Sequence, residues 1–239
     1  MNNLGSVFIK WFVYIFSFIT IGLALFIVGY VIVMGVPNLR PELFAWKYTT
    51  DNVSMLPAII NTIIMVVLVL IMVIPVGILS AIFLVEYSKE NKAVKLIHIA
   101  AETLAGIPSI IYGLFGMLFF VNLMKWGLSM ISGAATLAIM VLPVVMRTTS
   151  EALKSIPDTF REGSFGLGAG KLRTVFKIVL PPAVPGILSG VILSVGRIIG
   201  ETAALIFTAG TIAKVPAVSN LLFSSGRTMA VHIYLLASE

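Results

Sequence analysis

Residues 52–85 read NVSMLPAIINTIIMVVLVLIMVIPVGILSAIFLV and contain no Asp, Glu, Lys or Arg. A helix needs ~20 predominantly apolar residues to cross the hydrocarbon core of a bilayer, so this run is long enough to span it and to tilt. Asn61 and Pro75 interrupt the run, and neighbouring helices must satisfy the polar groups that these two residues leave inside the membrane. We therefore predict a transmembrane helix from about Pro57 to Val85.

The rest of the chain has the same apolar character. Apolar residues make up 59% of the sequence and charged residues 11%, against ~45–50% and ~25% in a soluble domain. Three other long runs carry no charge, and a fourth is broken only by Arg197 and Glu201. These runs are residues 11–39, 103–124, 126–146 and 179–210. We therefore predict an all-α membrane protein, a polytopic bundle with five transmembrane helices.

The net charge of +6 is distributed unevenly along the chain. If the N-terminus is cytoplasmic, ten Lys or Arg side chains lie inside and five lie outside, as the positive-inside rule requires. The inner ones are Lys10, Lys89, Lys92, Lys95, Arg147, Lys154, Arg161, Lys171, Arg173 and Lys177. The outer ones are Arg40, Lys47, Lys125, Lys214 and Arg227. The basic balance thus predicts a multi-pass protein of the plasma or inner membrane with a cytoplasmic N-terminus, and it requires no nucleic acid as partner.

The spans and loops predict two parts. Residues 1–56 would hold the first transmembrane helix and an outer loop, and residues 57–239 would hold a larger transmembrane domain. The longest cytoplasmic loop of that domain would cover residues 147–180. Near the end of the chain, the apolar residues 229–237 are too few to cross a bilayer as a helix, which takes ~20 residues. Five spans would leave the C-terminus outside.

The long inner loop predicts two short helices joined by glycines. Pro157 ends the helix before it, and Thr159 and Glu162 have the spacing of a capping box at the start of the first short helix. Gly168 suits the C-terminal end of that helix, where a left-handed backbone is easiest for glycine. The second short helix, residues 171–179, carries basic side chains on its polar side.

The glycine string within Gly163–Lys171 does not fit a phosphate-binding loop. Phe165 stands where such a loop needs glycine, and Leu172 stands where it needs Ser or Thr. The segment is either a plain connection whose basic residues set the topology, or a docking surface for another protein. Small side chains such as Ser164 and Gly168 let a partner approach the backbone closely, and this favours docking.

Arg197 and Glu201 are four residues apart in the last long run, so one helix would carry both on the same face. A charged side chain costs about 2.5–3.5 kcal/mol at the centre of a bilayer. We therefore expect the two to pair with each other and to face protein or water. The pair is either a structural link between helices or the polar lining of a translocation path, in which Arg197 meets an anion.

A motif in the inner loop resembles the cytoplasmic EAA loop of ABC importer permeases, through which an ATPase moves the permease. At the family's spacing, the matching residues are Glu162, Gly163, Ser164, Gly168, Ile178, Leu180 and Pro181. Gly163 and Ser164 replace the usual Ala-Ala, so the helix is expected to be less stable by roughly 1 kcal/mol. Two strings, Glu102–Gly116 and Gly196–Leu205, are similar to the phosphate-specific ABC permeases, and the single long N-terminal span is closer to their PstA type than to their PstC type.

The resemblance implies a MetI-like type I permease fold and a role as the permease subunit of an ATP-driven importer of inorganic phosphate. It implies four kinds of contact: a second permease of the PstC type, two ATP-binding cassette ATPase subunits, an external phosphate-binding protein and the lipid bilayer. It assigns ATPase coupling to the seven motif residues, and it adds Arg147 to Arg197 and Glu201 as candidates for the translocation path. Such permeases have a sixth span, so we expect a chain truncated at its C-terminus.

Two other functions are compatible with the residues. An ion-coupled secondary transporter of a small anion would use the Arg197–Glu201 pair as an ion relay, although no inverted repeat is visible. A structural membrane subunit would have no path of its own. The sequence contains no cysteine, no metal-ligand spacing and no nucleophile–base pair, so we expect no catalytic residue, metal or cofactor in this chain. ATP hydrolysis would belong to partner subunits.

Overall fold

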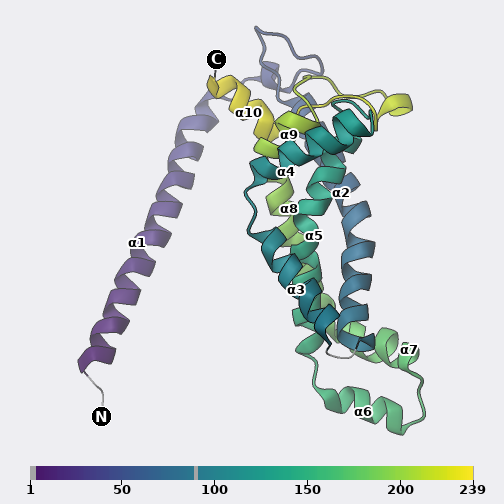
Figure 1. The fold of residues 1–239 in the computed structure, drawn as a ribbon. Helices are drawn as coiled ribbons and strands as arrows, with labels where there is room; N and C mark the ends of the chain where they lie inside the picture. The colour runs from purple at the N-terminus through teal and green to yellow at the C-terminus, as the bar shows by residue number, and fades with distance from the viewer. Residues whose placement is uncertain (1–3, 89–90, 239) are drawn as a thin grey trace. The chain divides into compact units, whose positions relative to one another are not determined.

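The computed structural model describes residues 4–88 and 91–238, and within these ranges it consists of helices and connecting turns without a strand. Figure 1 shows the helices along the chain. The chain divides into two compact units, Met1–Ala45 and Trp46–Glu239. The all-α architecture predicted from composition is confirmed.

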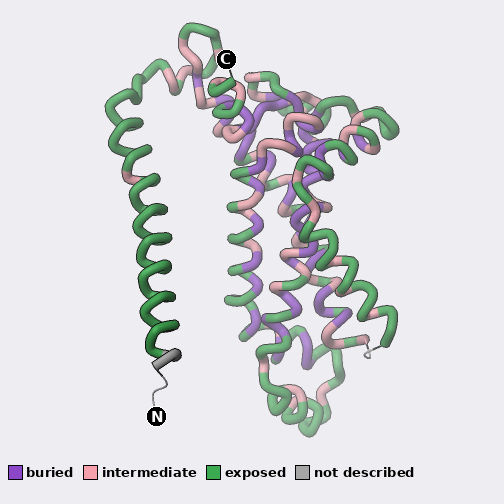
Figure 2. Tube along the Cα trace, turned by 60° about the vertical axis from the view of Figure 1, so that its left-hand side comes forward, coloured by how far each residue is buried: buried purple, intermediate pink, exposed green. Residues whose placement is uncertain are grey.

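The first unit consists of α1 (Leu4–Gly35) followed by two short 3-10 turns, η1 (Val36–Asn38) and η2 (Pro41–Phe44). The apolar side chains of α1 are exposed on all its sides within this unit, and Figure 2 shows the helix almost entirely in green. A helix that is apolar all round and has no protein core over it is typical of a membrane span. α1 is long and apolar enough to be the first span, as predicted.

The second unit begins at Trp46, earlier than the domain boundary expected after residue 56. Tyr48 explains the difference. Its ring lies 4.5 Å from the guanidinium carbon of Arg227 and 5.8 Å from the ring centre of His232, both near the other end of this unit's sequence. The loop before α2 is therefore part of the second unit and not of the first.

Three long helices form the centre of the second unit: α2 (Leu56–Ile82), α5 (Met130–Lys154) and α8 (Leu180–Gly200). A π-turn, η3 (Phe83–Tyr87), continues α2. The buried residues, purple in Figure 2, line the facing sides of these helices. The core that they share includes Met65, Val69, Val73, Leu137, Met140, Val141, Val145 and Ile198. The outer faces remain apolar, because a membrane helix needs no polar side toward lipid.

Glycines allow the three helices to approach closely. A Cβ added at Gly77 of α2 would lie 2.8 Å from Cγ1 of Val145 on α5, and one at Gly190 of α8 would overlap Oγ1 of Thr148 on α5. Small residues at contact points are how membrane helices gain packing without a hydrophobic driving force. α5 is thus held tightly by both neighbours.

The predicted span over residues 103–124 is not one helix. The structure has α3 (Lys92–Ala105) and α4 (Ser109–Gly116), with α4 continued by a π-turn, η4 (Met117–Leu123). The two pieces are bent by 99° at the break. Among the described residues, four helices are long and apolar enough to cross a membrane, or five if the bent pair counts as one span. The predicted third span is therefore a bent pair of helices, and counting it as one span gives the five that were predicted.

Proline and glycine cause this bend. Pro108 has no N–H and disfavours helical backbone in the residue before it. The N–H of Gly106, the residue just past the end of α3, donates to the carbonyls of Thr103 and Leu104 and closes the last turn of that helix. The Tyr112 hydroxyl then donates a hydrogen bond of 2.7 Å to the Leu104 carbonyl across the corner. The corner is therefore a defined structure and not a flexible joint.

The last predicted span, residues 179–210, is also broken. α8 ends at Gly200, and the short helix α9 (Ala203–Thr208) follows after a two-residue break. An outer segment then contains the 3-10 turn η6 (Val218–Asn220) and leads to α10 (Met229–Ser238). The prediction of one continuous helix to residue 210 was therefore wrong, and a hydrogen bond described below stabilises the break.

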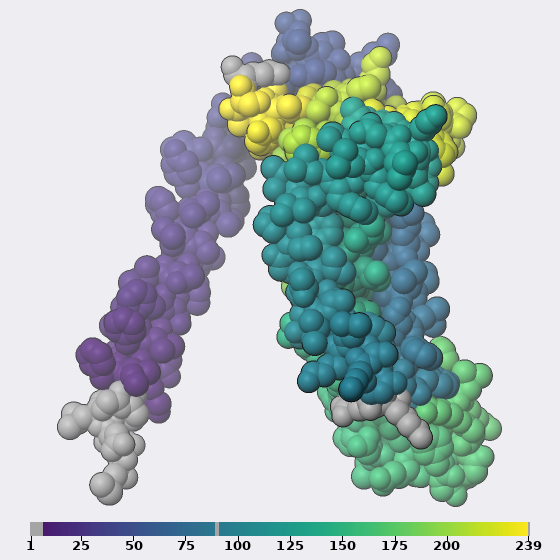
Figure 3. Space-filling view, in the orientation of Figure 1, coloured from purple at the N-terminus to yellow at the C-terminus, as the bar shows by residue number. Residues whose placement is uncertain are grey.

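Residues 155–179, called the inner segment after the side of the membrane predicted for them, contain the predicted short helical stretches. They are α6 (Asp158–Gly166) and α7 (Lys171–Thr174), the latter continued by a π-turn, η5 (Val175–Val179). In Figure 3 this segment, coloured green, forms one end of the second unit, while the yellow outer segment lies at the opposite end. The first short helix and the glycine connection are as predicted, but the second helix is not separate, because residues Lys171–Gly200 form one continuous helix in which α7 and η5 are the first turns.

Candidate functional site

The start of α6 differs from the expected capping box. α6 begins at Asp158, its N-cap is Pro157, and no side chain caps it there. Thr159 lies inside the first turn and cannot take the capping role that its spacing with Glu162 predicted. Asp158 occupies the first turn instead, where the positive end of the helix dipole favours a carboxylate.

Most of α6 faces away from the rest of the chain. Glu162 and Gly163 are exposed, and a Cβ added at Gly163 would meet nothing within 4 Å. Ser164 is half-buried, and its hydroxyl lies 2.8 Å from that of Thr174 on α7. The large apolar side chains exposed on α6 and just after it are Phe160, Phe165 and Leu167, at 51%, 46% and 91%. α6 therefore presents small and apolar residues together, which is typical of a surface that another protein covers.

Gly168 forms the turn between α6 and α7. Its φ is +81°, in the left-handed region that side chains rarely adopt. Its N–H donates to the Phe165 carbonyl at 2.9 Å, and the next N–H, of Ala169, donates to the Ser164 carbonyl at 3.1 Å. These bonds use the last carbonyls of α6, so the turn depends on glycine at this position.

The other three motif residues lie at the start of α8. Ile178 is in the π-turn η5, and Leu180 and Pro181 open α8, where a proline in the first turn loses no helical hydrogen bond. Val175 and Val179, also in η5, are buried in a hydrophobic cluster with residues of α2, α5 and α8. These three residues therefore connect the inner segment to α8 and do not lie on the exposed helix.

Reasoning from the sequence missed Arg161 and its partners, which fix α6 to the long helices. Nη2 donates to Glu86 Oε1 at 2.6 Å and to the Leu153 carbonyl at 3.0 Å, and Nε donates to both Glu86 oxygens at 3.2 and 3.3 Å. Nη1 donates to the Ile156 carbonyl at 2.8 Å and to Asp158 Oδ1 at 3.1 Å. The only local signal is that Arg161 directly precedes the motif.

The environment of this contact favours the charged form of the Arg161 guanidinium. The side chain of Arg161 is 16% exposed and that of Glu86 is 7% exposed. The Glu86 carboxylate raises the pKa of Arg161 above its ordinary value, mainly through their hydrogen bond. The guanidinium therefore stays protonated at every pH at which the protein is folded.

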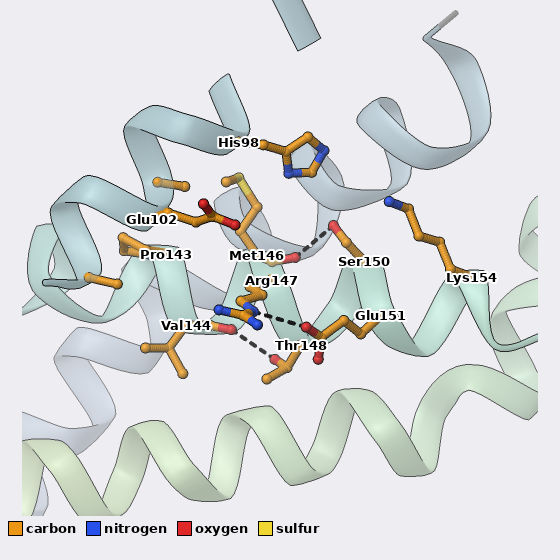
Figure 4. Close-up of a pocket in the computed structure, with 12 residues that line it drawn as sticks. His98, Glu102, Pro143, Val144, Met146, Arg147, Thr148, Ser150, Glu151 and Lys154 are labelled. Atoms are coloured by element: carbon orange, nitrogen blue, oxygen red, sulfur yellow. Dashed lines mark hydrogen bonds and ion pairs between the residues drawn. The ribbon is translucent and has the colours of Figure 1, made fainter. Parts of the chain in front are cut away.

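A polar cavity of about 770 Å³ opens between α3 and α5. Figure 4 shows Glu102 extending from α3 toward Arg147, which comes from α5. The polar lining residues are His98, Glu102, Arg147, Thr148, Ser150, Glu151 and Lys154. Arg147 Nε donates to Glu151 Oε1 at 2.9 Å, and the two side chains are 67% and 62% exposed. The cavity thus holds basic groups that are accessible from outside the chain.

Arg197 and Glu201 do not form the expected pair. Glu201 lies past the end of α8 in extended backbone, and its Oε1 accepts a hydrogen bond of 3.0 Å from the Ala204 N–H. It therefore satisfies one N–H in the first turn of α9, whose N-cap is Thr202, and this bond stabilises the break in the predicted span. Among the described residues, no ion pair joins Glu201 to the half-buried Arg197. Neither side chain lines the cavity that contains Arg147.

Asn61 has partners for its amide nitrogen inside the second unit. Its side chain is fully buried, and Nδ2 donates to the carbonyls of Lys214 at 3.0 Å and Arg227 at 3.2 Å, whereas Oδ1 has no partner among the described residues. The neighbouring Thr62 accepts a hydrogen bond of 2.9 Å from the Met229 N–H. The partners of Asn61 therefore come from the non-helical segment after α9 and not, as expected, from a neighbouring helix.

The sequence pattern of the family described as "Binding-protein-dependent transport system inner membrane component" matches residues 73–237. The chain belongs to this family. It is accordingly a multi-pass membrane protein, and the matched range covers α5, the inner segment and α8 in full. The resemblance noted in the inner loop therefore extends to most of the second unit.

Several curated relatives belong to phosphate systems. The chain is 33% identical to "Phosphate transport system permease protein PstA homolog" of Mycoplasma pneumoniae, over 98% of this chain and 37% of the relative. It is 37% identical to "Phosphate transport system permease protein PstA" of Pasteurella multocida, over 74% and 64%. It is 36% identical to "Probable ABC transporter permease protein YqgI" of Bacillus subtilis, over 76% and 63%. The chain thus spans less than two thirds of the length of these relatives.

A solved structure has the same fold. It is an inward-facing conformation of the MetNI methionine ABC transporter, with a TM-score of 0.52 and 17% sequence identity, over 77% of this chain and 86% of that one. At this identity the likeness concerns the fold alone. The MetI-like permease fold expected from the resemblance is confirmed.

Proposed function

We propose that this chain is a permease subunit of an ATP-driven importer of inorganic phosphate. Its family membership supports an ABC permease, and the names of its relatives in Mycoplasma pneumoniae and Pasteurella multocida support phosphate as the solute and the PstA role. The observation that carries the coupling role is α6, a short helix that presents exposed apolar and small residues outside the long spans.

The docking of an ATPase would explain the surface of α6. Phe160, Phe165 and Leu167 offer apolar area for a groove on a partner, and Gly163 with Ser164 lets that groove reach the backbone. When two ATPase subunits close on ATP, they move α6, and the spans rock between inward-open and outward-open arrangements. The chain itself binds no ATP in this scheme. The N-terminus and the inner segment face the cytoplasm, in accord with the charge distribution.

Arg147 and Arg197 would provide positive charge along the translocation path. Arg147 is paired only to the exposed Glu151, so a phosphate oxygen can replace this carboxylate at little cost. Glu102 faces the same cavity and would keep an anion from binding too tightly. Glu201 would act on the path indirectly by holding the corner between α8 and α9. A PstC-type permease would complete the path, and an external phosphate-binding protein would deliver the solute.

The alternative of an ion-coupled transporter depended on a paired Arg197 and Glu201, and the two side chains do not form this pair. Its relay required Arg197 and Glu201 to exchange a proton or ion as a pair, but the Glu201 carboxylate is occupied by the Ala204 N–H. We therefore carry only the ATP-driven importer forward.

The decisive experiment is uptake of radiolabelled phosphate by vesicles that contain the assembled importer. Gly163→Trp should block docking of the ATPase without disturbing the chain, since Gly163 has open space around it. Ala93→Trp, at an exposed position on α3, is the matched control. We expect ATP-dependent uptake in the native and control complexes and its loss, with loss of bound ATPase, in Gly163→Trp. Uptake that needs no ATP and stops when the proton gradient collapses would refute the proposal.

A further inference from the structure

Arg161 is bound in a way that an ordinary surface arginine is not. A guanidinium has five N–H donors, and those of Arg161 reach Glu86, two backbone carbonyls and Asp158. The side chain of Asp158 is 85% exposed, whereas that of Glu86 is 7% exposed. Of the two carboxylate partners of Arg161, one is therefore inside the protein and one is in solvent. Of these two carboxylates, only the inner one, that of Glu86, belongs to another helix.

These partners are the inner ends of two long helices. Glu86 lies in the π-turn that continues α2, and the carbonyls of Leu153 and Ile156 lie at the C-terminal end of α5. A helix end leaves carbonyls without intrahelical partners, and a cation stabilises the negative end of the helix dipole. Arg161 thus ties α6 to both helices at once, and those helices share the packed core of the second unit.

The two ends of α6 are attached differently. At its start, Pro157 restricts the backbone and Arg161 adds its hydrogen bonds. At its end, Gly166 is the last residue of α6, Gly168 and Gly170 follow in the connection to α7, and each would meet no neighbour within 4 Å if it carried a Cβ. The side-chain hydrogen bond from this half of α6 to α7 is the contact of 2.8 Å between the hydroxyls of Ser164 and Thr174, and it carries no charge. A glycine-rich connection transmits displacement poorly because its backbone has many accessible conformations.

We propose that Arg161 is the positioning residue that transfers movement of α6 to α2 and α5, in preference to the glycine turn that leads to α8. A push on α6 moves the guanidinium, which carries Glu86 and the end of α5 with it. This role rests on the proposed function, since it requires an ATPase that moves α6. It adds that the force enters the bundle through one buried ion pair outside the motif.

The test compares two carboxylates on one arginine. In the reconstituted importer, phosphate imported per ATP hydrolysed is measured for Arg161→Gln, Glu86→Gln, their double variant and Asp158→Asn. Coupling between sites is typically worth about 5–150-fold, so we expect this ratio to fall by about tenfold in Arg161→Gln and Glu86→Gln. The double variant should be no worse than Arg161→Gln, because both changes break the same contact. Asp158→Asn, the matched control, should keep the native ratio.

The bound ATPase and its hydrolysis rate separate coupling from folding. We expect Arg161→Gln to retain the bound ATPase and its hydrolysis rate while phosphate uptake falls. A native ratio of phosphate imported to ATP hydrolysed in this variant would overturn the inference, and so would an equal fall of this ratio in Asp158→Asn. If Arg161→Gln does not assemble, Arg161→Lys decides, because one ammonium keeps the charge but cannot hold Glu86 and both carbonyls. A lowered ratio in assembled Arg161→Lys supports the inference, and a native ratio overturns it. Absence of ATP-driven uptake in the native complex would instead refute the proposed function.

Discussion

Two arginine–glutamate pairs in the second unit have the same chemistry in opposite surroundings. Arg147 and Glu151 lie one turn apart on α5, joined at 2.9 Å with side chains 67% and 62% exposed. Arg161 and Glu86 are joined at 2.6 Å with side chains 16% and 7% exposed, and they come from different helices. An exposed pair contributes little to stability and exchanges partners readily. A buried pair with filled donors instead holds elements together, because breaking it leaves a charge without water or partner.

The largest expected difference between the two pairs is in how much each contributes to the stability of the folded chain. Glu86→Ala leaves Arg161 without its buried partner, and we expect the free energy of unfolding to fall by about 2–3 kcal/mol, less than the ~3–5 kcal/mol of a fully buried pair. Glu151→Ala should leave the thermal transition unchanged, since its partner is solvated. Thermal unfolding of the detergent-purified chain, followed by tryptophan fluorescence, measures both. Equal transitions for the two variants would contradict a difference based on burial.

The next effect should be in transport. If Arg147 meets the anion, Arg147→Gln should lower the rate of phosphate uptake by about tenfold or more, the size of one lost charge-assisted contact. Its thermal transition should stay at the native value, in contrast to that of Glu86→Ala. Arg147→Lys, which keeps the charge, serves as the control and should retain part of the uptake. Native uptake in Arg147→Gln would remove this residue from the path.

A smaller effect should follow from the turn that closes α6. Gly168→Ala places a side chain at φ +81°, which costs about 1–2 kcal/mol in a left-handed residue. Since Arg161 holds the other end of α6, we expect the helix to stay attached to α2 and α5 while its end frays. Hydrogen exchange should therefore rise at Leu167 and Ala169 more than at Arg161. The outcome that would contradict this is equal exchange along all of α6.

The smallest effect should come from salt. Raising the ionic strength from about 0.1 M to 1 M shortens the Debye length from ~10 Å to ~3 Å. Phosphate uptake by the native complex should therefore decrease, because salt anions compete at the exposed Arg147. The difference in melting temperature between the native chain and Glu86→Ala should persist at high salt. Melting curves of the native chain and Glu86→Ala at both salt concentrations test this. Convergence of the two curves at 1 M would show that the inner pair is screened as well.

Local patterns predicted much of this molecule. The uncharged run around Pro75 forms α2 in the structure. This helix could be predicted because a membrane span requires a continuous apolar stretch, which the composition of the run shows directly. The turn at Gly168 was predicted because its backbone conformation is one that glycine adopts most easily. Of the motif residues on α6, Glu162 and Gly163 are exposed and Ser164 is half-buried.

The two spans that the structure breaks have a common explanation: at each position, continuing the helix competes with ending it. Residues around Pro108 are apolar enough for one helix, yet the chain bends there by 99°, because Pro108 interrupts the helical hydrogen bonds and the hydrogen bond from Tyr112 to Leu104 closes the corner. Glu201 is spaced to pair with Arg197 on a continuous helix, but its carboxylate accepts a hydrogen bond from the Ala204 N–H instead. In both places a hydrogen bond between a side chain and a nearby backbone group stabilises the break and outweighs the periodic pattern.

The sequence by itself determined that this chain enters a membrane, where its long spans lie, and that a glycine-bent inner segment separates two of them. Those properties depend on apolar length and on residue types within a few positions of one another. Only the tertiary structure decided that Arg161 binds Glu86, a residue 75 positions earlier in the chain. Neither residue has a local partner that specifies the contact, so the pairing exists only after α2 and α5 have packed and brought their inner ends together.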